Sequence, residues 1–300
     1  MLGAMLGSDA ATVCLPEAQF IAQLITDKHP LDAADIRALV DKIAAHPRYK
    51  VWNARIDAAD MLHLAGAGGY AEFIDAFAAA YGRSVGKPAA RRWVDHSPIN
   101  IRNAGRLAAA FPNAKFIHIF RDGRAVANSL MPLDWGPNNI IDAARHWQAS
   151  LSIGFGLSAV LPSDRLLHVK YEDLVQDGAA TMRRVAASVG IAYSDELLDT
   201  GGLKVPHYTR VNHRLVGAAV DPTRIDAWRD RLPAREIEVF EYMAGGLLTH
   251  LGYALVNDRG PKAPSRSERL RWRLLDAYKR QVNARRWRTR VGGAQNAQSA

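Results

Sequence analysis

The sequence predicts an α/β fold in which a parallel sheet is flanked by helices. Two short apolar runs, Lys115 to Phe120 and Arg165 to Lys170, are typical of buried strands. Each run is followed by a segment of helical periodicity, and strands that alternate with helices indicate a parallel sheet with helices on both faces. Arg91 to Val94 is a third, shorter strand candidate. With 300 residues, 48% of them hydrophobic, the chain can bury the core of one large α/β domain or two small ones.

The N-terminal part of the chain is predicted to be mostly helical. Met1 to Leu6 reads as a short helix, and residues 7–17 read as a turn with a short apolar piece. Residues 18–90 are expected to form a helical insert, in which one helix presents Phe73, Ile74, Phe77 and Tyr81 on one face. We expect its three helices at residues 18–26, 32–44 and 69–82.

Four further helices are predicted to surround the strands. Their expected ranges are Ile99 to Phe111, Asn138 to Val160, about Ala179 to Val189, and Pro233 to Leu251. Residues 200–222 have the composition of a loop.

The net charge of +9 is concentrated at the C-terminal end. Residues 261–300 contain 11 Lys and Arg against two acidic residues, whereas residues 1–260 contain 28 of each sign. We therefore expect a neutral main domain over 1–260 and a basic tail over 261–300. The main domain is neutral and has no recognised nucleic-acid-binding motif, so a nucleic-acid partner is not expected. Only the basic tail keeps that alternative open.

The cysteine content and the N-terminal segment predict the cellular compartment of the protein. Cys14 is the single cysteine, so an internal disulfide is excluded and a reducing compartment is indicated. No apolar run approaches the length that spans a bilayer, and the segment MLGAMLGSDAA lacks the basic start of a signal peptide. We expect a cytoplasmic protein.

The segment from Ala114 to Leu130, AKFIHIFRDGRAVANSL, is the strongest functional signal. The strand ends at Arg121, Gly123 permits a tight turn, and a helix follows with Ser129 about two turns along it. Ligands of open α/β sheets bind at this end of the strands. A guanidinium fork and a hydroxyl that converge there suit a phosphate dianion. The alternative is an ordinary surface ion pair between Arg121 and Asp122.

Arg121 and Ser129, eight residues apart across a strand, a turn and a helix, resemble the 3′-phosphate motif of the sulfotransferases. The surrounding FPNAKFIHIFRDGRAVANSL is similar to the bacterial and tyrosylprotein branch of that family. The resemblance covers most of residues 1–256 and implies a P-loop-like α/β fold with a helical lid. It also implies transfer of a sulfuryl group from 3′-phosphoadenosine 5′-phosphosulfate (PAPS) to a hydroxyl or amine of a small-molecule, carbohydrate or peptide acceptor. The family requires no metal, and the ten histidines show no metal-ligand spacing.

Two further segments resemble nucleotide-binding parts of the family. YEDLV, from Tyr171, is similar to a strand-end motif whose tyrosine lies near the nucleotide; a half-buried core tyrosine is the alternative. TRIDAWRDRL resembles the late loop that caps the nucleotide and contains Trp228. The family often has a basic residue immediately before this tryptophan, where the present chain has Ala227, so we expect Arg224 or Arg229 to substitute.

Glu17 and His96 are the catalytic candidates. Sulfuryl transfer needs a base for the acceptor proton, and Glu17 matches the position of the glutamate that serves as base in the tyrosylprotein branch. His96 occupies the position where many relatives have a lysine that touches the transferring group, and an imidazole can donate a hydrogen bond or accept a proton there. The alternatives are a solvated loop glutamate and a histidine that fixes the turn before Pro98.

One part of the family pattern has no counterpart in this sequence. Relatives carry a first strand and a Gly-rich loop whose backbone N–H groups hold the 5′-phosphosulfate, whereas Met1 to Leu6 aligns with the helix after that loop. We expect the natural chain to start further upstream. The alternative function is a non-catalytic module, related to the sulfotransferases, that binds the desulfonated product PAP or a partner. A nucleotide kinase is disfavoured because no Gly-rich GK[ST] loop is present.

The basic tail has two interpretations. Ser265 and Glu268 form a predicted capping box, after which Leu270, Leu274, Tyr278 and Val282 fall on one helical stripe among arginines. Such a helix can lie on an anionic membrane or on nucleic acid. The other interpretation, which we favour, is a solvated and partly disordered tail, with residues 292–300 disordered.

Overall fold

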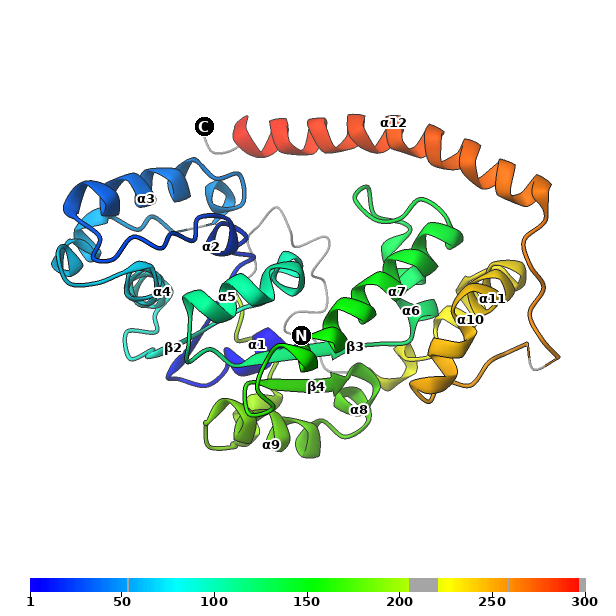
Figure 1. The fold of residues 1–300 in the computed structure, drawn as a ribbon, viewed down its shortest axis with the longest axis horizontal. Coiled ribbons are helices and arrows are strands. Elements are labelled where there is room, and N and C mark those ends of the chain that lie inside the picture. The colour runs from blue at the N-terminus through cyan, green and yellow to red at the C-terminus, as the bar shows by residue number, and fades with distance from the viewer. Residues whose placement is uncertain (53, 205–220, 258, 297–300) are drawn as a thin grey trace. The chain divides into compact units, whose positions relative to one another are not determined.

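The computed structural model describes residues 1–52, 54–204, 221–257 and 259–296, and side chains up to residue 286. Figure 1 shows the order of the elements along the chain. The chain divides into two compact units: unit 1 comprises residues 1–117, 157–167 and 177–220, and unit 2 comprises residues 118–156, 168–176 and 221–300. Most of the loop predicted over 200–222 lies outside the described residues. No described helix combines the length and apolar character needed to cross a membrane.

Unit 1 is mainly helical. Its helices and strands are α1 (Leu2–Leu6), β1 (Thr12–Leu15), α2 (Phe20–Gln23), α3 (Ala33–Ala45), α4 (Tyr70–Ser84), β2 (Arg92–Asp95), α5 (Ala104–Ala110) and α9 (Gly178–Val189). Short 3₁₀ helices lie at Tyr49–Val51, Ala58–Asp60, Leu62–Leu64, Pro98–Asn103, Leu157–Ala159 and Asp195–Leu198. The described part of residues 18–90 is therefore helical, as predicted.

Unit 2 holds most of the two remaining strands and the long C-terminal helices. Its elements are β3 (Phe116–Phe120), α6 (Gly123–Leu130), α7 (Ile140–Gly156), β4 (Leu166–Lys170), α8 (Tyr171–Gln176), a 3₁₀ turn at Pro222–Arg224, α10 (Trp228–Arg231), α11 (Ala234–His250) and α12 (Arg266–Asn296). The first residues of β3 and β4 belong to unit 1.

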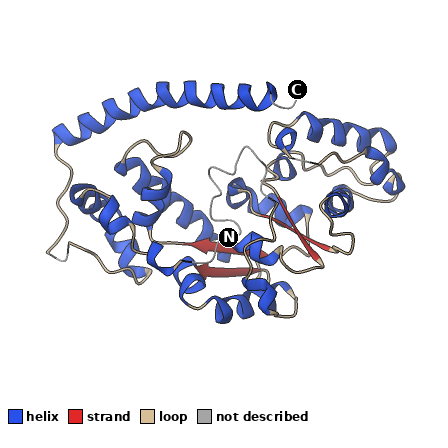
Figure 2. Ribbon diagram, turned by 180° about the vertical axis from the view of Figure 1, so that it is seen from behind, coloured by secondary structure: helices blue, strands red, loops and turns tan. Residues whose placement is uncertain are grey.

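The described strands form two separate two-stranded sheets. β1 pairs with β2 in parallel, from Thr12 opposite Arg92 to Leu15 opposite Asp95. β3 and β4 lie side by side, and their arrows point the same way in Figure 2. The three predicted strands are confirmed, but a single sheet is wrong for the described residues. β1 was missed as a strand because its four buried residues give no alternation from which a period can be recognised.

Several predicted helices are shorter or differently wound than expected. The first helix of the insert is the four-residue α2, and the helix predicted over Ile99 to Phe111 begins as a 3₁₀ helix before α5. The helix predicted up to Val160 ends at Gly156 and continues as a 3₁₀ turn. In the tail, α12 runs to Asn296, and the disorder predicted for residues 292–300 stays a prediction.

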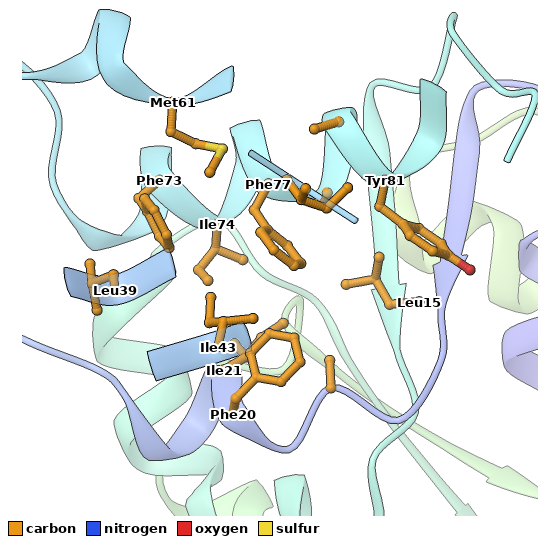
Figure 3. Packing of buried hydrophobic residues seen from close by; sticks show 14 of the residues in the cluster. Leu15, Phe20, Ile21, Leu39, Ile43, Met61, Phe73, Ile74, Phe77 and Tyr81 are labelled. Carbon is orange, nitrogen blue, oxygen red and sulfur yellow. The ribbon is translucent and has the colours of Figure 1, made fainter. Parts of the chain in front are cut away.

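An aromatic cluster forms the core of unit 1. The ring of Phe20 lies 5.6 Å from Trp52 and 5.7 Å from Phe77, centroid to centroid, and Trp52 lies 5.0 Å from Tyr81. Helix α4 supplies its predicted apolar face to this core, and Figure 3 shows Phe73, Ile74, Phe77 and Tyr81 pointing into it. Edge-to-face and tilted ring pairs of this kind add to the burial energy of each ring.

Gly123 allows close packing in unit 2 rather than a left-handed turn. It is the first residue of α6 and its φ is not positive. A Cβ at this position would lie 2.5 Å from both Phe240 Cζ and Trp147 Cδ2. The start of α6 therefore packs directly against α7 and α11 because residue 123 has no side chain. The sequence suggested that Gly123 is needed for a tight turn; the structure shows that it is needed for close helix packing instead.

A buried ionic cluster joins α6 to α11. Arg124, 1% exposed, donates to both carboxylate oxygens of Asp122 and, at 2.5 Å, to Glu241, which is also 1% exposed. Glu241 accepts three further hydrogen bonds, from Val256 N and from both nitrogens of Asn257. Burial alone would raise the pKa of Glu241, but the hydrogen bonds from Val256, Asn257 and Arg124 outweigh it, so its pKa is lowered.

A pair of histidines links β3 to β4. The Nδ1 atoms of His118 and His168 lie 2.9 Å apart, and the ring of Phe155 stacks on His168 with centroids 4.8 Å apart. Burial and, to a smaller extent, the neighbouring His168 together lower the pKa of His118 to about 4. Burial also lowers the pKa of His168. Burial therefore favours the neutral form of both rings in the folded protein.

Replacing Arg124 should destabilise the protein strongly. Arg124→Ala leaves the carboxylates of Asp122 and Glu241 buried without their cation, so the free energy of unfolding should fall by about 3–5 kcal/mol. The matched control is Arg145→Ala, since Arg145 is 69% exposed and its ion pair with Asp142 spans 3.5 Å on one helix surface. That control should lose less than about 1 kcal/mol. Urea unfolding of both variants measures the difference, and equal losses would contradict a structural role for the cluster.

Acid should weaken the fold through His118. Because its folded pKa, about 4, lies below the ordinary value of 6.5, the unfolded chain binds more protons between these pH values, and stability rises with pH there. This contribution is fully present above pH 6.5 and is lost as the pH falls toward 4. Its size is at most about 3.5 kcal/mol. In His118→Phe the free energy of unfolding should depend less on pH in this window, as urea titrations at several pH values will test. An unchanged pH dependence would contradict the assignment.

Candidate functional site

Arg121 lies where β3 ends, and its surroundings come from three segments of unit 2. Its guanidinium lies over the ring of Tyr171, 4.4 Å from the centroid, and one Nη donates to the carbonyl of Arg224 at 2.9 Å. Its own carbonyl accepts from Trp147 Nε1 at 3.0 Å. The structure therefore brings together three of the predicted nucleotide-site residues: Arg121, Tyr171 and Arg224.

Arg121 also has an unused donor. Its Nε is buried and has no hydrogen-bond partner among the described residues. A buried donor of a charged group without a partner is costly, and it identifies a position where an anion would be stabilised. This property fits the phosphate group that the sequence predicted for this position.

The backbone around Arg121 is fixed by the adjacent carboxylates. Asp122 caps α6 by accepting from Arg124 N at 2.8 Å, and its own N–H donates to Glu172 Oε1 at 3.0 Å. Glu172 also accepts from the hydroxyl of Tyr253 at 2.9 Å. The end of β3 is thus tied to α8, directly after β4, so Arg121 and Tyr171 are held at the ends of neighbouring strands.

Trp228 lies inside unit 2. It is 1% exposed, and its ring lies between the guanidinium of Arg124, 4.0 Å from the centroid, and that of Arg229, 4.6 Å away. Its Nε1 is buried and lacks a partner among the described residues. Arg229 is anchored by Asp226 at 3.0 Å. Trp228 therefore has neither an exposed ring face nor an exposed N–H, and its predicted binding role stays a prediction.

Ser129 is placed in the last turn of α6 and is exposed. It takes no part in the described contacts that join Arg121 to Tyr171 and Arg224. Its hydroxyl is accessible, and its role in phosphate binding stays a prediction.

The two catalytic candidates belong to unit 1 and follow a parallel strand pair. Leu15 pairs with Asp95, so Glu17, two residues after β1, and His96, the residue after β2, both follow the carboxyl ends of the paired strands. Glu17 forms an ion pair with Arg48 at 3.3 Å and keeps a quarter of its side chain exposed. His96 Nδ1 lies 3.8 Å from Cys14 Sγ. Burial raises the pKa of Cys14 to about 12, so this thiol stays protonated and is no nucleophile at neutral pH.

Asp95 organises this edge and was not identified from the sequence. One of its oxygens accepts from Ser97 N, Ser97 Oγ and Ala18 N, and the other accepts from Asn100 Nδ2 at 2.8 Å. Because Ala18 follows Glu17, Asp95 ties the loop after β1 to the loop after β2. The local Asp-His-Ser turn can be recognised from the sequence. The hydrogen bond from Ala18 N to Asp95 spans 77 residues, and no sequence pattern predicts it.

Among the described residues, no group of three or more His, Cys, Asp and Glu side chains has the arrangement of a metal site.

Comparison with known proteins identifies relatives of the sequence. The chain is 28% identical over 173 residues to protein-tyrosine sulfotransferase A of Caenorhabditis elegans. The aligned segment covers 55% of this chain and 45% of the relative. It is 24% identical over 180 residues to protein-tyrosine sulfotransferase 2 of Gallus gallus, covering 56% of this chain and 48% of the relative. The matched segment thus spans about half the length of these relatives.

Solved structures support the same fold. The sulfotransferase domain of the Synechococcus PCC 7002 olefin synthase aligns with a TM-score of 0.53 and 19% identity, over 85% of this chain and 90% of that domain. The sulfotransferase domain of the curacin biosynthetic pathway aligns with a TM-score of 0.53 and 16% identity, over 85% of this chain and 93% of that domain. The α/β fold is therefore that of a sulfotransferase domain.

The Sulfotransferase family model matches residues 1–195, nearly two thirds of the chain. This match contains β1 to β4 together with Glu17, His96, Arg121, Ser129 and Tyr171. The chain belongs to the sulfotransferase family.

Proposed function

We propose that this protein transfers a sulfuryl group from PAPS to a hydroxyl or amine acceptor. The observation that carries the proposal is the buried Nε of Arg121, which lacks a partner among the described residues at the carboxyl end of β3. A phosphate oxygen supplies the acceptor that this N–H lacks, and the guanidinium supplies the opposite charge.

Nucleotide binding is assigned to unit 2. Arg121 and the exposed hydroxyl of Ser129 bind the 3′-phosphate. Tyr171 holds the guanidinium of Arg121 in place through its ring, 4.4 Å away. Arg224 and Arg229 add positive charge from the segment that contains Trp228. PAPS supplies the activated sulfonate when it is bound, and these residues orient its nucleotide part.

Proton transfer is assigned to the β1–β2 edge of unit 1. As the acceptor oxygen forms its bond to sulfur, the bond from sulfur to the 5′-phosphate oxygen breaks and PAP leaves with the electron pair. The carboxylate of Glu17 takes the proton of the acceptor hydroxyl, and the imidazole of His96 donates a hydrogen bond to the transferring group. Asp95 is assigned as a positioning residue, since its hydrogen bonds join the loop after β1 to the loop after β2.

Tyrosyl peptides are the first acceptors to examine. Two of the relatives are named protein-tyrosine sulfotransferases, and a phenol hydroxyl loses its proton more readily than an alcohol. Carbohydrates and small alcohols are the alternative acceptors. A non-catalytic PAP-binding protein is the alternative function, and it predicts PAP binding without transfer to any of these acceptors.

Arg121→Ala should weaken PAP binding by at least about tenfold, because the variant loses a charged donor pair worth more than 1.4 kcal/mol. Isothermal titration calorimetry with PAP measures the change. Arg145→Ala is the matched control, since Arg145 is an exposed arginine of the same unit, and its affinity should equal that of the wild type. An unchanged affinity of Arg121→Ala would contradict the phosphate-binding assignment.

Glu17→Gln should lower kcat by at least about 100-fold, because the amide cannot accept the proton, while the affinity for PAP stays within about twofold. Transfer from labelled PAPS is measured with a tyrosyl peptide, a carbohydrate and a phenol as acceptors. Glu196→Gln, at an exposed position of the same unit, is the control and should keep full activity.

Two results would overturn these assignments in different ways. If the wild-type chain transfers sulfate and Glu17→Gln does so equally well, Glu17 is not the base. If the wild-type chain binds PAP and transfers to none of the three acceptors, the non-catalytic alternative is correct.

A further inference from the structure

Helix α12 presents an apolar stripe to solvent. Leu270, Leu274 and Tyr278 follow one another at four-residue spacing and are 58%, 63% and 66% exposed. At 3.6 residues per turn these side chains share one face of the helix. Val282, predicted for the same stripe, is half-buried and lies at its edge. Three neighbouring exposed apolar side chains on one helix indicate a surface that makes contacts elsewhere.

The opposite face of α12 is fixed to unit 2. Trp272 is 8% exposed and packs in the core with residues of α7 and α11. Asp276 accepts from Asn138 Nδ2 at 2.8 Å, Lys279 donates to the carbonyl of Asn138 at 2.9 Å, and Asn283 Nδ2 lies 3.0 Å from Asn138 Oδ1. These contacts set the rotation of the helix, so the stripe faces outward.

The start of α12 is held by a second set of contacts, the Arg235 clamp. Arg235, in α11, bonds both carboxylate oxygens of Glu268, at 2.8 Å and 3.0 Å, and donates to the carbonyls of Lys262 and Ala263. The predicted capping box is confirmed, since Ser265 N donates to Glu268 at 2.7 Å and Glu268 N donates to Ser265 Oγ at 3.2 Å. The helix is therefore anchored at its first turn and along its inner face.

The charge of the outward face has a single sign. Arg266, Arg271 and Arg273 are exposed and flank the stripe. Both acidic residues of the helix are already paired: Glu268 pairs with Arg235 of α11, and Asp276 pairs with Arg280 of the same helix at 2.8 Å and accepts from Asn138. No carboxylate of this helix is left to oppose an anionic partner.

We propose that α12 is a surface-binding helix that docks unit 2 on a bilayer containing anionic lipids. The flanking arginines pair with anionic headgroups, while Leu270, Leu274 and Tyr278 enter the boundary between headgroups and acyl chains. The positive charge selects an anionic surface, and the apolar stripe selects one with an apolar interior. A nucleic acid would use the arginines but gain little from the leucines.

The test is co-sedimentation of the full chain with vesicles. Vesicles of phosphatidylcholine with about 30% phosphatidylserine should bind the protein, whereas vesicles of phosphatidylcholine alone should bind it at least about tenfold less. Raising the salt concentration from about 0.1 M to about 0.5 M should weaken the binding, because it screens the arginines.

Two triple variants separate the contributions. Leu270→Gln/Leu274→Gln/Tyr278→Gln removes the stripe and keeps the charge, and Arg266→Gln/Arg271→Gln/Arg273→Gln removes charge and keeps the stripe. Each should lower the partition coefficient by at least about tenfold. The control is Val160→Gln/Tyr242→Gln, which changes apolar side chains that are 69% and 48% exposed outside α12 and should bind as the wild type does. Circular dichroism should be the same for all three variants, since every changed side chain is exposed.

Three results would overturn the proposal. The first is full vesicle binding by the stripe variant, which would mean that electrostatic attraction alone explains the binding. The second is a dimer in sedimentation velocity without vesicles that the stripe variant loses, which would make a second copy the occupant of the stripe. The third is binding to a DNA duplex that is tighter than binding to the anionic vesicles.

Discussion

The ionic cluster around Arg124 is the interaction on which the rest of unit 2 depends. A guanidinium that is 1% exposed is stable only if its charge is compensated on all sides. Asp122 compensates it from the start of α6, Glu241 compensates it from α11, and the ring of Trp228 covers it at 4.0 Å. Through this one side chain the end of β3 is bound to α11 and to the segment that carries Arg224 and Arg229.

The cluster also explains why Arg121 and Arg124, three residues apart, have different roles. Both follow β3, but the charge of Arg124 is used inside unit 2, whereas Arg121 keeps an unbonded Nε. The sequence Arg-Asp-Gly-Arg does not distinguish them, since either arginine is compatible with a surface ion pair. What separates them is Glu241, which lies 117 residues further along the chain, and no local pattern identifies such a partner.

Because local patterns do not identify partners that are distant in the sequence, only some parts of the fold can be predicted from it. β3, α6 and α4 were recognisable because their periods and termini are local properties of five to fifteen residues. β1 was not, because four buried residues become a strand only through pairing with β2. Glu17 and His96 were identified individually through the family resemblance, but the bond from Ala18 N to Asp95 that ties their two loops together is a property of the folded chain.

The Arg235 clamp has a mechanical consequence. The net charge of +9 resides in residues 261–300, whereas residues 1–260 are neutral, so the excess positive charge lies on α12 and the residues that flank it. An electric field acting on a loose tail would only stretch the tail. Because α12 is fastened to unit 2 at its first turn, the field exerts a torque on the whole unit. In the proposed docking on an anionic bilayer, this torque turns the unit so that α12 leads before contact forms.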